Sequence, residues 1–296
     1  MSQVRIQFTL FSAFYSPLIV TMAGGFLRDE GIDYEWSVAP PGHSAIEAVV
    51  SGSADVIQSA PSQAFTSLNQ GRKPPVVHFA QINEMDGFFI TARNPDENFD
   101  WNVLEGSEVV LFESGQPNAM FRYACHKAGI NHDEIKAIHP GGADAIDRAF
   151  REGQGRFVQQ QGPYPQQLKS EGLGSIVAQV GPVIGSCAFS SLAASPEWLD
   201  TPEAVAFTRA YRAARRHLND ASADEIVDLT QSWFPGIDHL ALKDCIASYQ
   251  SLGCWTPHIE IRREAFDVIN DVFQYTGAIS RRYDYDKVCC LPPDSC

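Results

Sequence analysis

The sequence predicts an α/β fold with mainly parallel sheets, and two observations support this prediction. Short apolar or alternating segments and helical segments follow one another along most of the first 190 residues, which is the pattern of consecutive β-α-β units. This pattern stops at a polar stretch over residues 94–106 and then begins again. A chain of 296 residues, 44% of them hydrophobic, is long and apolar enough for two domains or one large one.

The first run of elements begins close to Met1. Apolar and polar residues alternate over residues 4–10, which predicts a strand. Ser16-Pro17 then has the form of a helix N-cap and first-turn proline, and Gly31 is placed to end that helix. The same kinds of signal predict strands over 32–38, 54–58, 76–82 and 88–92, and helices over 44–51 and 62–69.

The second run repeats this order, and the end of the chain is helical. Strands are predicted over 108–112, 135–139, 156–160, 175–180 and 188–192, with helices over 117–128 and 143–151. Thr201-Pro202 predicts the start of a helix that ends near residue 218, and Ser222 with Glu225 predicts a capping box for the next one. Helices over 240–252 and 262–275 complete the set, the last with Phe266, Ile269 and Phe273 as a buried stripe.

Charge and hydropathy exclude several classes of function. The net charge of −14 argues against a nucleic-acid partner or an anionic membrane surface, because both require clustered Lys and Arg. No segment reaches the roughly 20 apolar residues of a membrane span, so a membrane-embedded protein is not expected. An anion held locally by backbone N–H groups stays compatible with this composition.

The N-terminus and the cysteines bear on the compartment. A strand that begins so close to Met1 leaves no room for an export signal ahead of it, so the chain is expected to be cytoplasmic as it stands, or periplasmic if a native signal was removed. Seven cysteines are an odd number, which favours free thiols. Cys289, Cys290 and Cys296 lack the spacing of a zinc site, so no metal or cofactor is expected, and their role stays open.

Three short motifs, in their order along the chain, resemble a known family. They are SPLIVTMAGGFLRDEG over residues 16–31, AIEAVVSGSADV over residues 45–56 and GAIS over residues 277–280. With these motifs the sequence resembles the SsuA/THI5-like (NMT1-like) family of type II periplasmic substrate-binding proteins. The resemblance covers nearly the whole chain and agrees with the repeated β-α-β pattern.

The resemblance implies a two-lobed type II periplasmic-binding-protein-like fold with a ligand cleft between the lobes. Residues 1–85 and 190–296 would form lobe one, and residues 86–189 lobe two. The implied function is that of a solute-binding protein of an ABC transporter, which closes its two lobes over a small molecule. The implied macromolecular partner is the transporter permease.

An enzyme on the same scaffold is the alternative. The resemblance extends to thiamine-pyrimidine synthases, which require a cysteine-rich run and a histidine that is consumed. Here residues 185–190 contain Cys187 alone, and Gln63 occupies the histidine position. Decarboxylases and dehydratases of small acids also use this scaffold, and fold alone does not separate them from binding proteins. A binding protein is therefore favoured, and no catalytic residue is assigned.

The predicted cleft loops follow the carboxyl ends of the strands, where open α/β sheets bind ligands. These loops carry aromatic, amide, hydroxyl and carboxylate side chains but no Lys or Arg. The predicted ligand-binding residues are Phe14, Tyr15, Ser16, Ser59, Ser62, Gln63, Glu84, Asp86, Glu113, Ser114, Gln116, Asn118, Gln160, Gln161 and Tyr164. Ordinary structural roles are the alternative for several of them: core packing for Phe14, helix capping for the serines, and solvated turns for Glu84 and Asp86.

The same loops predict the chemistry of the ligand. A site for sulfonate or another strong anion usually recruits Arg, whose fork matches the oxyanion. Uncompensated carboxylates in a closed cleft are costly, and a ligand N–H or positive charge relieves that cost. A neutral or cationic heteroaromatic or amine is therefore expected, with Tyr15 and Tyr164 stacking on its ring.

Overall fold

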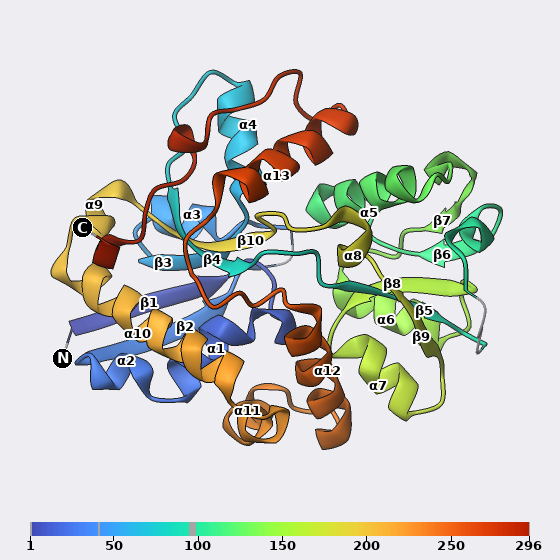
Figure 1. Cartoon of the computed structure of the whole chain (residues 1–296), viewed down its shortest axis with the longest axis horizontal. Coiled ribbons are helices and arrows are strands. Elements are labelled where there is room, and N and C mark those ends of the chain that lie inside the picture. Colours follow the sequence, from blue (N-terminus) through green and yellow to red (C-terminus); the bar gives the residue numbers. More distant parts are fainter. Residues whose placement is uncertain (1, 41, 95–98, 296) are drawn as a thin grey trace.

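The computed structural model describes residues 2–40, 42–94 and 99–295 and contains two five-stranded sheets. Helices pack against both sheets, and the two sheets lie side by side along the longest axis of the molecule (Figure 1). The predicted α/β class is confirmed. Among the residues described, no helix combines the length and the apolar character that crossing a membrane requires.

The first sheet has the strand order β2-β1-β3-β10-β4. Strand β1 is parallel to β2 and β3, whereas β10 is antiparallel to both of its neighbours. These strands are β1 (Ser2–Phe8), β2 (Ile32–Val38), β3 (Val56–Ser59), β4 (Val77–Asn83) and β10 (Ser190–Ala194). The first part of the chain and one late strand therefore build one sheet together.

The second sheet has the order β7-β6-β8-β5-β9 and uses only the middle of the chain. Its strands are β5 (Phe88–Ala92), β6 (Glu108–Val110), β7 (Lys136–Ile138), β8 (Phe157–Gln161) and β9 (Ser175–Gln179). Its helices are α5 (Gly115–Ala128), α6 (Ala143–Arg151), α7 (Tyr164–Ser170) and α8 (Gly181–Ile184). The chain crosses between the sheets after β4 and after β9, so β5, which the sequence analysis placed in the first run, belongs to the second sheet.

The remaining helices surround the first sheet or extend from it. They are α1 (Ser16–Ala23), α2 (Phe26–Asp29), α3 (Ile46–Val50), α4 (Ala64–Asn69), α9 (Pro196–Leu199), α10 (Pro202–Asp220), α11 (Ala223–Thr230), α12 (His239–Leu252) and α13 (Arg263–Tyr275). The predicted capping box of Ser222 and Glu225 is present. The helix predicted over residues 17–30 is instead divided into α1 and α2, because Gly25 adopts a left-handed conformation with φ of 80°.

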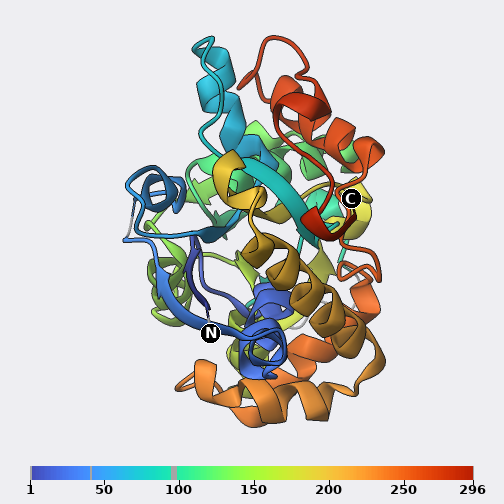
Figure 2. The ribbon, with the colours of Figure 1, turned by 90° about the vertical axis from the view of Figure 1, so that its left-hand side faces the viewer.

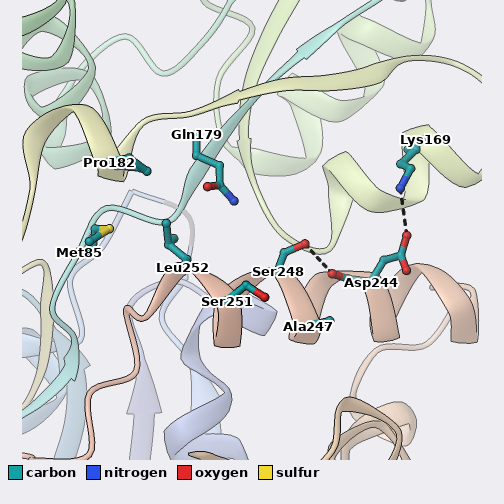
Figure 3. Close-up of a pocket in the computed structure, with 9 residues that line it drawn as sticks. All are labelled: Met85, Lys169, Gln179, Pro182, Asp244, Ala247, Ser248, Ser251 and Leu252. Carbon is teal, nitrogen blue, oxygen red and sulfur yellow. Dashed lines mark hydrogen bonds and ion pairs between the residues drawn. The ribbon is translucent and has the colours of Figure 1, made fainter.

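Helix α12 connects the two halves of the molecule. Although it belongs to the C-terminal part of the chain, it packs against α7 of the second sheet (Figures 1 and 2). Lys169 of α7 forms an ion pair with Asp244 of α12 at 3.1 Å, at one end of a groove of about 650 Å³ (Figure 3). The division at residues 85/86 and 189/190 stays a prediction, and α12 is the element that complicates it.

Candidate ligand-binding site

A cavity of about 560 Å³ lies between the two sheets and is the candidate site. Its lining comes from segments that follow β1, β3, β6 and β8, together with the first turn of α5. The larger groove beside α12 contains none of these segments. The cavity therefore has the position expected for a ligand site at the carboxyl ends of the strands.

Several predicted residues line this cavity or the hollow beside it. Tyr15, Ser62, Gln63, Ser114, Gln116 and Gln161 line the cavity itself. Gln160 and Tyr164 line a smaller hollow, which also contains Gln161 and which shares Leu10 and Phe112 with the cavity. The two spaces are therefore adjacent, and the amides at the end of β8 separate them.

Other predicted residues lie away from the cavity in structural roles. Phe14 is fully buried in the core, where its ring packs against Tyr249 at a centroid distance of 4.9 Å. Ser16 Oγ donates to the Ala13 carbonyl at 2.7 Å, and Asn118 Nδ2 donates to the Phe112 carbonyl at 2.9 Å. Ser59 is buried within β3 and Glu113 is exposed, and neither lines the cavity.

Glu84 is neutralised by other residues and is not a cavity carboxylate. It is only 3% exposed, and its Oε2 lies 2.7 Å from His258 Nε2 while Oε1 pairs with the Arg262 guanidinium. Ser186 Oγ also donates to Oε1 at 2.8 Å. Burial alone would raise the pKa of Glu84, but the hydrogen bonds outweigh burial and lower this pKa to about 2. The expectation of an uncompensated carboxylate is therefore wrong for Glu84.

Asp86 is a buried carboxyl in the segment between β4 and β5, and it does not line the cavity. Its Oδ1 accepts from the Phe88 backbone N–H at 2.7 Å, and its Oδ2 has no partner among the described residues. Burial raises the pKa of Asp86 to about 7. The reading of Asp86 as a solvated turn residue is wrong as well, since the side chain is fully buried.

This pKa predicts that Asp86 makes the protein less stable as the pH rises. An unfolded Asp titrates near pH 3.9, so the folded state binds more protons between about pH 4 and pH 7, and stability falls through that window. Asp86→Asn keeps an oxygen for the Phe88 N–H and removes the charge. We expect the free energy of unfolding of the variant at pH 8 to be higher than that of the wild type by up to about 4 kcal/mol. Urea unfolding at pH 5 and pH 8 measures this, and equal pH slopes for both proteins would contradict it.

The cavity lining contains residues that the sequence analysis did not place there. They include Ser44, Thr66, Ser190 and Phe273. Phe273 ends the apolar stripe of α13, but it is only half-buried and its position beside the cavity depends on how α13 packs. A helical stripe does not reveal such a position, because the same spacing describes a residue that faces only the core.

The described residues that line the cavity include no Lys, Arg, Asp or Glu. The aromatic residues Tyr15, Phe112, Phe189 and Phe273 supply apolar surface, and hydroxyl and amide groups supply the polar part. His43 is exposed and its Nδ1 lies 2.7 Å from Glu47. The loops predicted a cavity without Lys and Arg, and the described lining residues include no carboxylates either.

Hydrogen bonds connect the two sides of the cavity. Ser62, which follows β3, donates to Gln116 Oε1 of α5, and Gln116 Nε2 donates to the Phe189 carbonyl at 2.7 Å. Further along, Ser12 Oγ donates to the Gly162 carbonyl at 2.7 Å, which joins the loop after β1 to the loop after β8. The two sides are therefore held together in the conformation described here.

Two amide oxygens at the end of β8 are buried without a partner. Gln161 Oε1 and Gln160 Oε1 have no hydrogen-bond donor among the described residues, although these side chains are only 6% and 2% exposed. Gln160 Nε2 donates to Asp147 at 3.2 Å, which fixes that amide. Buried acceptors without donors are costly, so both oxygens are suited to a donor supplied by water or by a ligand.

The start of α5 is the feature of the cavity that favours negative charge. Its N-cap, Ser114, makes no side-chain capping hydrogen bond, and residues 114–117 line the cavity. The first N–H groups of a 14-residue helix carry a partial positive charge there. The cavity therefore contains one anion-compatible end beside otherwise neutral walls.

The cysteines give no evidence for a reactive or metal-binding centre. Cys125, Cys187, Cys245, Cys254 and Cys289 are free thiols, and Cys296 lies outside the described residues. Cys187 is fully buried, and burial raises the pKa of its thiol well above the ordinary value. Within residues 2–40, 42–94 and 99–295, no group of three or more His, Cys, Asp or Glu side chains is arranged to hold a metal ion.

Solved structures with the same fold superpose on nearly the whole chain. The ligand-binding component of an ABC-type import system from Staphylococcus aureus, with zinc bound, has a TM-score of 0.78 and 14% identity, covering 100% of this chain and 98% of that one. The alkanesulfonate-binding protein SsuA from Xanthomonas axonopodis pv. citri, bound to MOPS, has a TM-score of 0.75 and 15% identity, covering 98% and 99%. The fold is therefore that of periplasmic binding proteins.

The sequence comparisons establish the family. The NMT1/THI5-like family model matches residues 13–217, so the chain belongs to the NMT1/THI5-like family. The putative binding protein YtlA of Bacillus subtilis (strain 168) is 26% identical over 292 residues, which are 97% of this chain and 87% of that protein. The family resemblance seen in the sequence is thereby confirmed.

Proposed function

We propose that this protein is the substrate-binding component of an ABC-type transporter and that the cavity between the sheets holds its ligand. The observation that carries the proposal is the cavity itself, because it is lined from both sheets and bridged by the Ser62–Gln116 hydrogen bond. Family membership supports it, as does the fold shared with the import component from Staphylococcus aureus. The transporter permease is the partner that this function requires.

The proposed motion is closure of two lobes over the ligand. Residues 1–85 and 190–296 would move against residues 86–189, with the segments after β4 and after β9 as hinges. Bonds such as that of Ser12 Oγ to the Gly162 carbonyl would form on closure and break on release. The contact of α12 with α7 would then slide or open during the same motion.

The proposed ligand is a neutral or cationic heteroaromatic or amine. The oxygen of Gln161 would accept one of its N–H groups, and rings such as Tyr15 and Phe112 would contact its faces. The described residues of the lining include no Lys or Arg for a strong anion. Carboxylates in the cavity would favour a cationic ligand, but Glu84 and Asp86 lie elsewhere. A neutral ligand is therefore the better match.

A thermal-shift panel of pyrimidines, alkyl amines and alkanesulfonates tests this function and ligand class together. We expect a pyrimidine or an amine to stabilise the wild type by about 2.7 kcal/mol at a hundred times its dissociation constant. Gln161→Ala is expected to remove most of this stabilisation because a principal acceptor is lost. Gln154→Ala, at an exposed position outside the cavity, is the matched control and is expected to respond like the wild type.

Two results of this panel would count against the proposal. Stabilisation by alkanesulfonates alone, retained in Gln161→Ala, would contradict the ligand class and would favour an anion at the first turn of α5. A lack of stabilisation by any ligand of the panel, in wild type and variants alike, would count against the proposed function.

A further inference from the structure

A second hollow, of about 630 Å³, lies on the outer side of the first sheet. It is formed by the end of α4, the loop that follows it, the start of β4 and the segment after α13. Figures 1 and 2 both show α4 beside this C-terminal segment. The hollow shares no lining residue with the cavity between the sheets, so it is a separate site.

Hydrogen bonds fix the walls of this hollow. Tyr283 Oη donates to Asn69 Oδ1 at 2.6 Å, which joins the C-terminal segment to α4. Cys290 N–H donates to the His78 carbonyl at 3.0 Å and His78 N–H donates to the Val288 carbonyl at 2.9 Å, so the same segment pairs with β4. A ligand would therefore meet a shape that is already formed, which reduces the entropy cost of binding.

Cationic side chains converge on the hollow. Arg72, Lys73, Arg281 and Lys287 line it, whereas the chain as a whole has a net charge of −14. Among the described residues that line it there is one carboxylate, Asp286, and this group is already paired with Arg263 at 2.6 Å.

The pairing of these cations leaves charge available for a ligand. Lys287 has Asp284 at 3.2 Å, Arg72 donates to the neutral Gln70 side chain, and the charge of Lys73 acts on Glu197. Across the described part of the chain, however, Arg72, Lys73 and Arg281 form no ion pair. Like charges that gather without partners repel one another, and an anion placed among them relieves that repulsion.

We infer that this hollow binds a phosphate monoester attached to a small apolar or aromatic body. The guanidinium forks of Arg72 and Arg281 match phosphate oxygens, and a nearly dianionic group suits several converging cations. Leu68, Val77 and Tyr283 supply apolar surface beside them. The volume lies within the range of small-molecule sites, roughly 300–1,000 Å³.

Isothermal titration with adenosine monophosphate tests this site, with adenosine and inorganic phosphate as comparison ligands. We expect the wild type to bind adenosine monophosphate more tightly than either comparison ligand, because only this ligand carries both parts. Arg72→Gln/Arg281→Gln is expected to bind it at least about tenfold more weakly. Arg148→Gln/Arg216→Gln, which removes two exposed arginines elsewhere that form no ion pair in the described chain, is expected to leave binding unchanged.

Vesicles distinguish a free ester from a lipid headgroup. Binding to phosphatidic acid vesicles but not to adenosine monophosphate, abolished in Arg72→Gln/Arg281→Gln alone, would support the site and identify a lipid as the source of the phosphate. Binding of inorganic phosphate as tight as that of the ester would show an adventitious ion only and would overturn the proposal. Equal binding by both double variants, or no binding of any phosphate probe, would overturn it too. None of these variants touches the cavity between the sheets, so this test and that of the proposed function are independent.

Discussion

Substituting Gly87 by alanine is expected to lower the free energy of unfolding by about 3 kcal/mol. A Cβ atom at this position would lie 2.2–2.5 Å from three atoms of the Phe14 ring. That ring cannot move aside easily, because it is fully buried and packs against Phe189 and Tyr249 with centroid distances of 5.4 and 4.9 Å. The clash lies in the segment between β4 and β5, where the chain crosses from one sheet to the other.

Urea unfolding of three variants measures the effect of this clash. Gly142→Ala is the matched control, because a Cβ there meets nothing within 4 Å, and as the N-cap of α6 it is expected to lose at most about 1 kcal/mol. Phe14→Leu added to Gly87→Ala is expected to recover part of the loss, since the smaller side chain makes room. Equal stability of Gly87→Ala and Gly142→Ala would contradict the packing of Phe14 described here.

Glu84 is expected to make the protein sensitive to acid. The pKa of Glu84 is lowered to about 2, so its contribution is fully present above its unfolded value near 4.3 and is lost as the pH falls toward 2. Since the Arg262 side chain is 47% exposed, solvent screens part of the interaction, and we expect a contribution of about 2 kcal/mol. The cluster joins both crossing segments, through Glu84 and Ser186, to the segment between α12 and α13.

Comparison of wild type with Glu84→Gln between pH 6 and pH 3 tests this contribution. The wild type is expected to lose more stability than the variant over that interval, because glutamine has no charge to lose. Glu152→Gln serves as the control, since this side chain is exposed and forms no ion pair or side-chain hydrogen bond in the described chain. Parallel acid profiles for wild type and Glu84→Gln would show that the ion pairs contribute no net stability.

Local signals in the sequence predicted most elements but not their ends. Alternation predicted a first strand over residues 4–10, whereas β1 is Ser2–Phe8 because Thr9 and Leu10 turn away, held by Gln58 Oε1 at 3.0 and 3.1 Å. Gln58 lies 49 positions from Thr9, so nothing near the strand indicates where it ends. The restart of the β-α-β pattern after residue 94 correctly anticipated a second sheet.

Local signals also predicted some residues of the candidate site and failed for residues whose partners are distant in the sequence. Ser62 follows β3 and Gln161 is the last residue of β8, and the rule for carboxyl ends predicted that both lie beside the cavity. Glu84 also follows a strand, but β4 leads into the crossing segment, where His258 and Arg262 cover it. Those partners lie 174 and 178 positions away, and no local pattern announces such contacts. Among the described residues the cavity lining contains no Lys or Arg, and the carboxylates of Glu84 and Asp86 lie away from it.

Native mass spectrometry of the protein, purified without unfolding, tests most directly whether the cavity between the sheets holds a ligand. It also shows whether that ligand is released without chemical change. We predict a non-covalent adduct whose released molecule is a neutral or cationic nitrogen compound, with the same mass after incubation as before. The adduct should be absent from Gln161→Ala and present in Gln154→Ala. An anionic adduct that Gln161→Ala retains, or a released molecule whose mass changes during incubation, would contradict a neutral binding cleft.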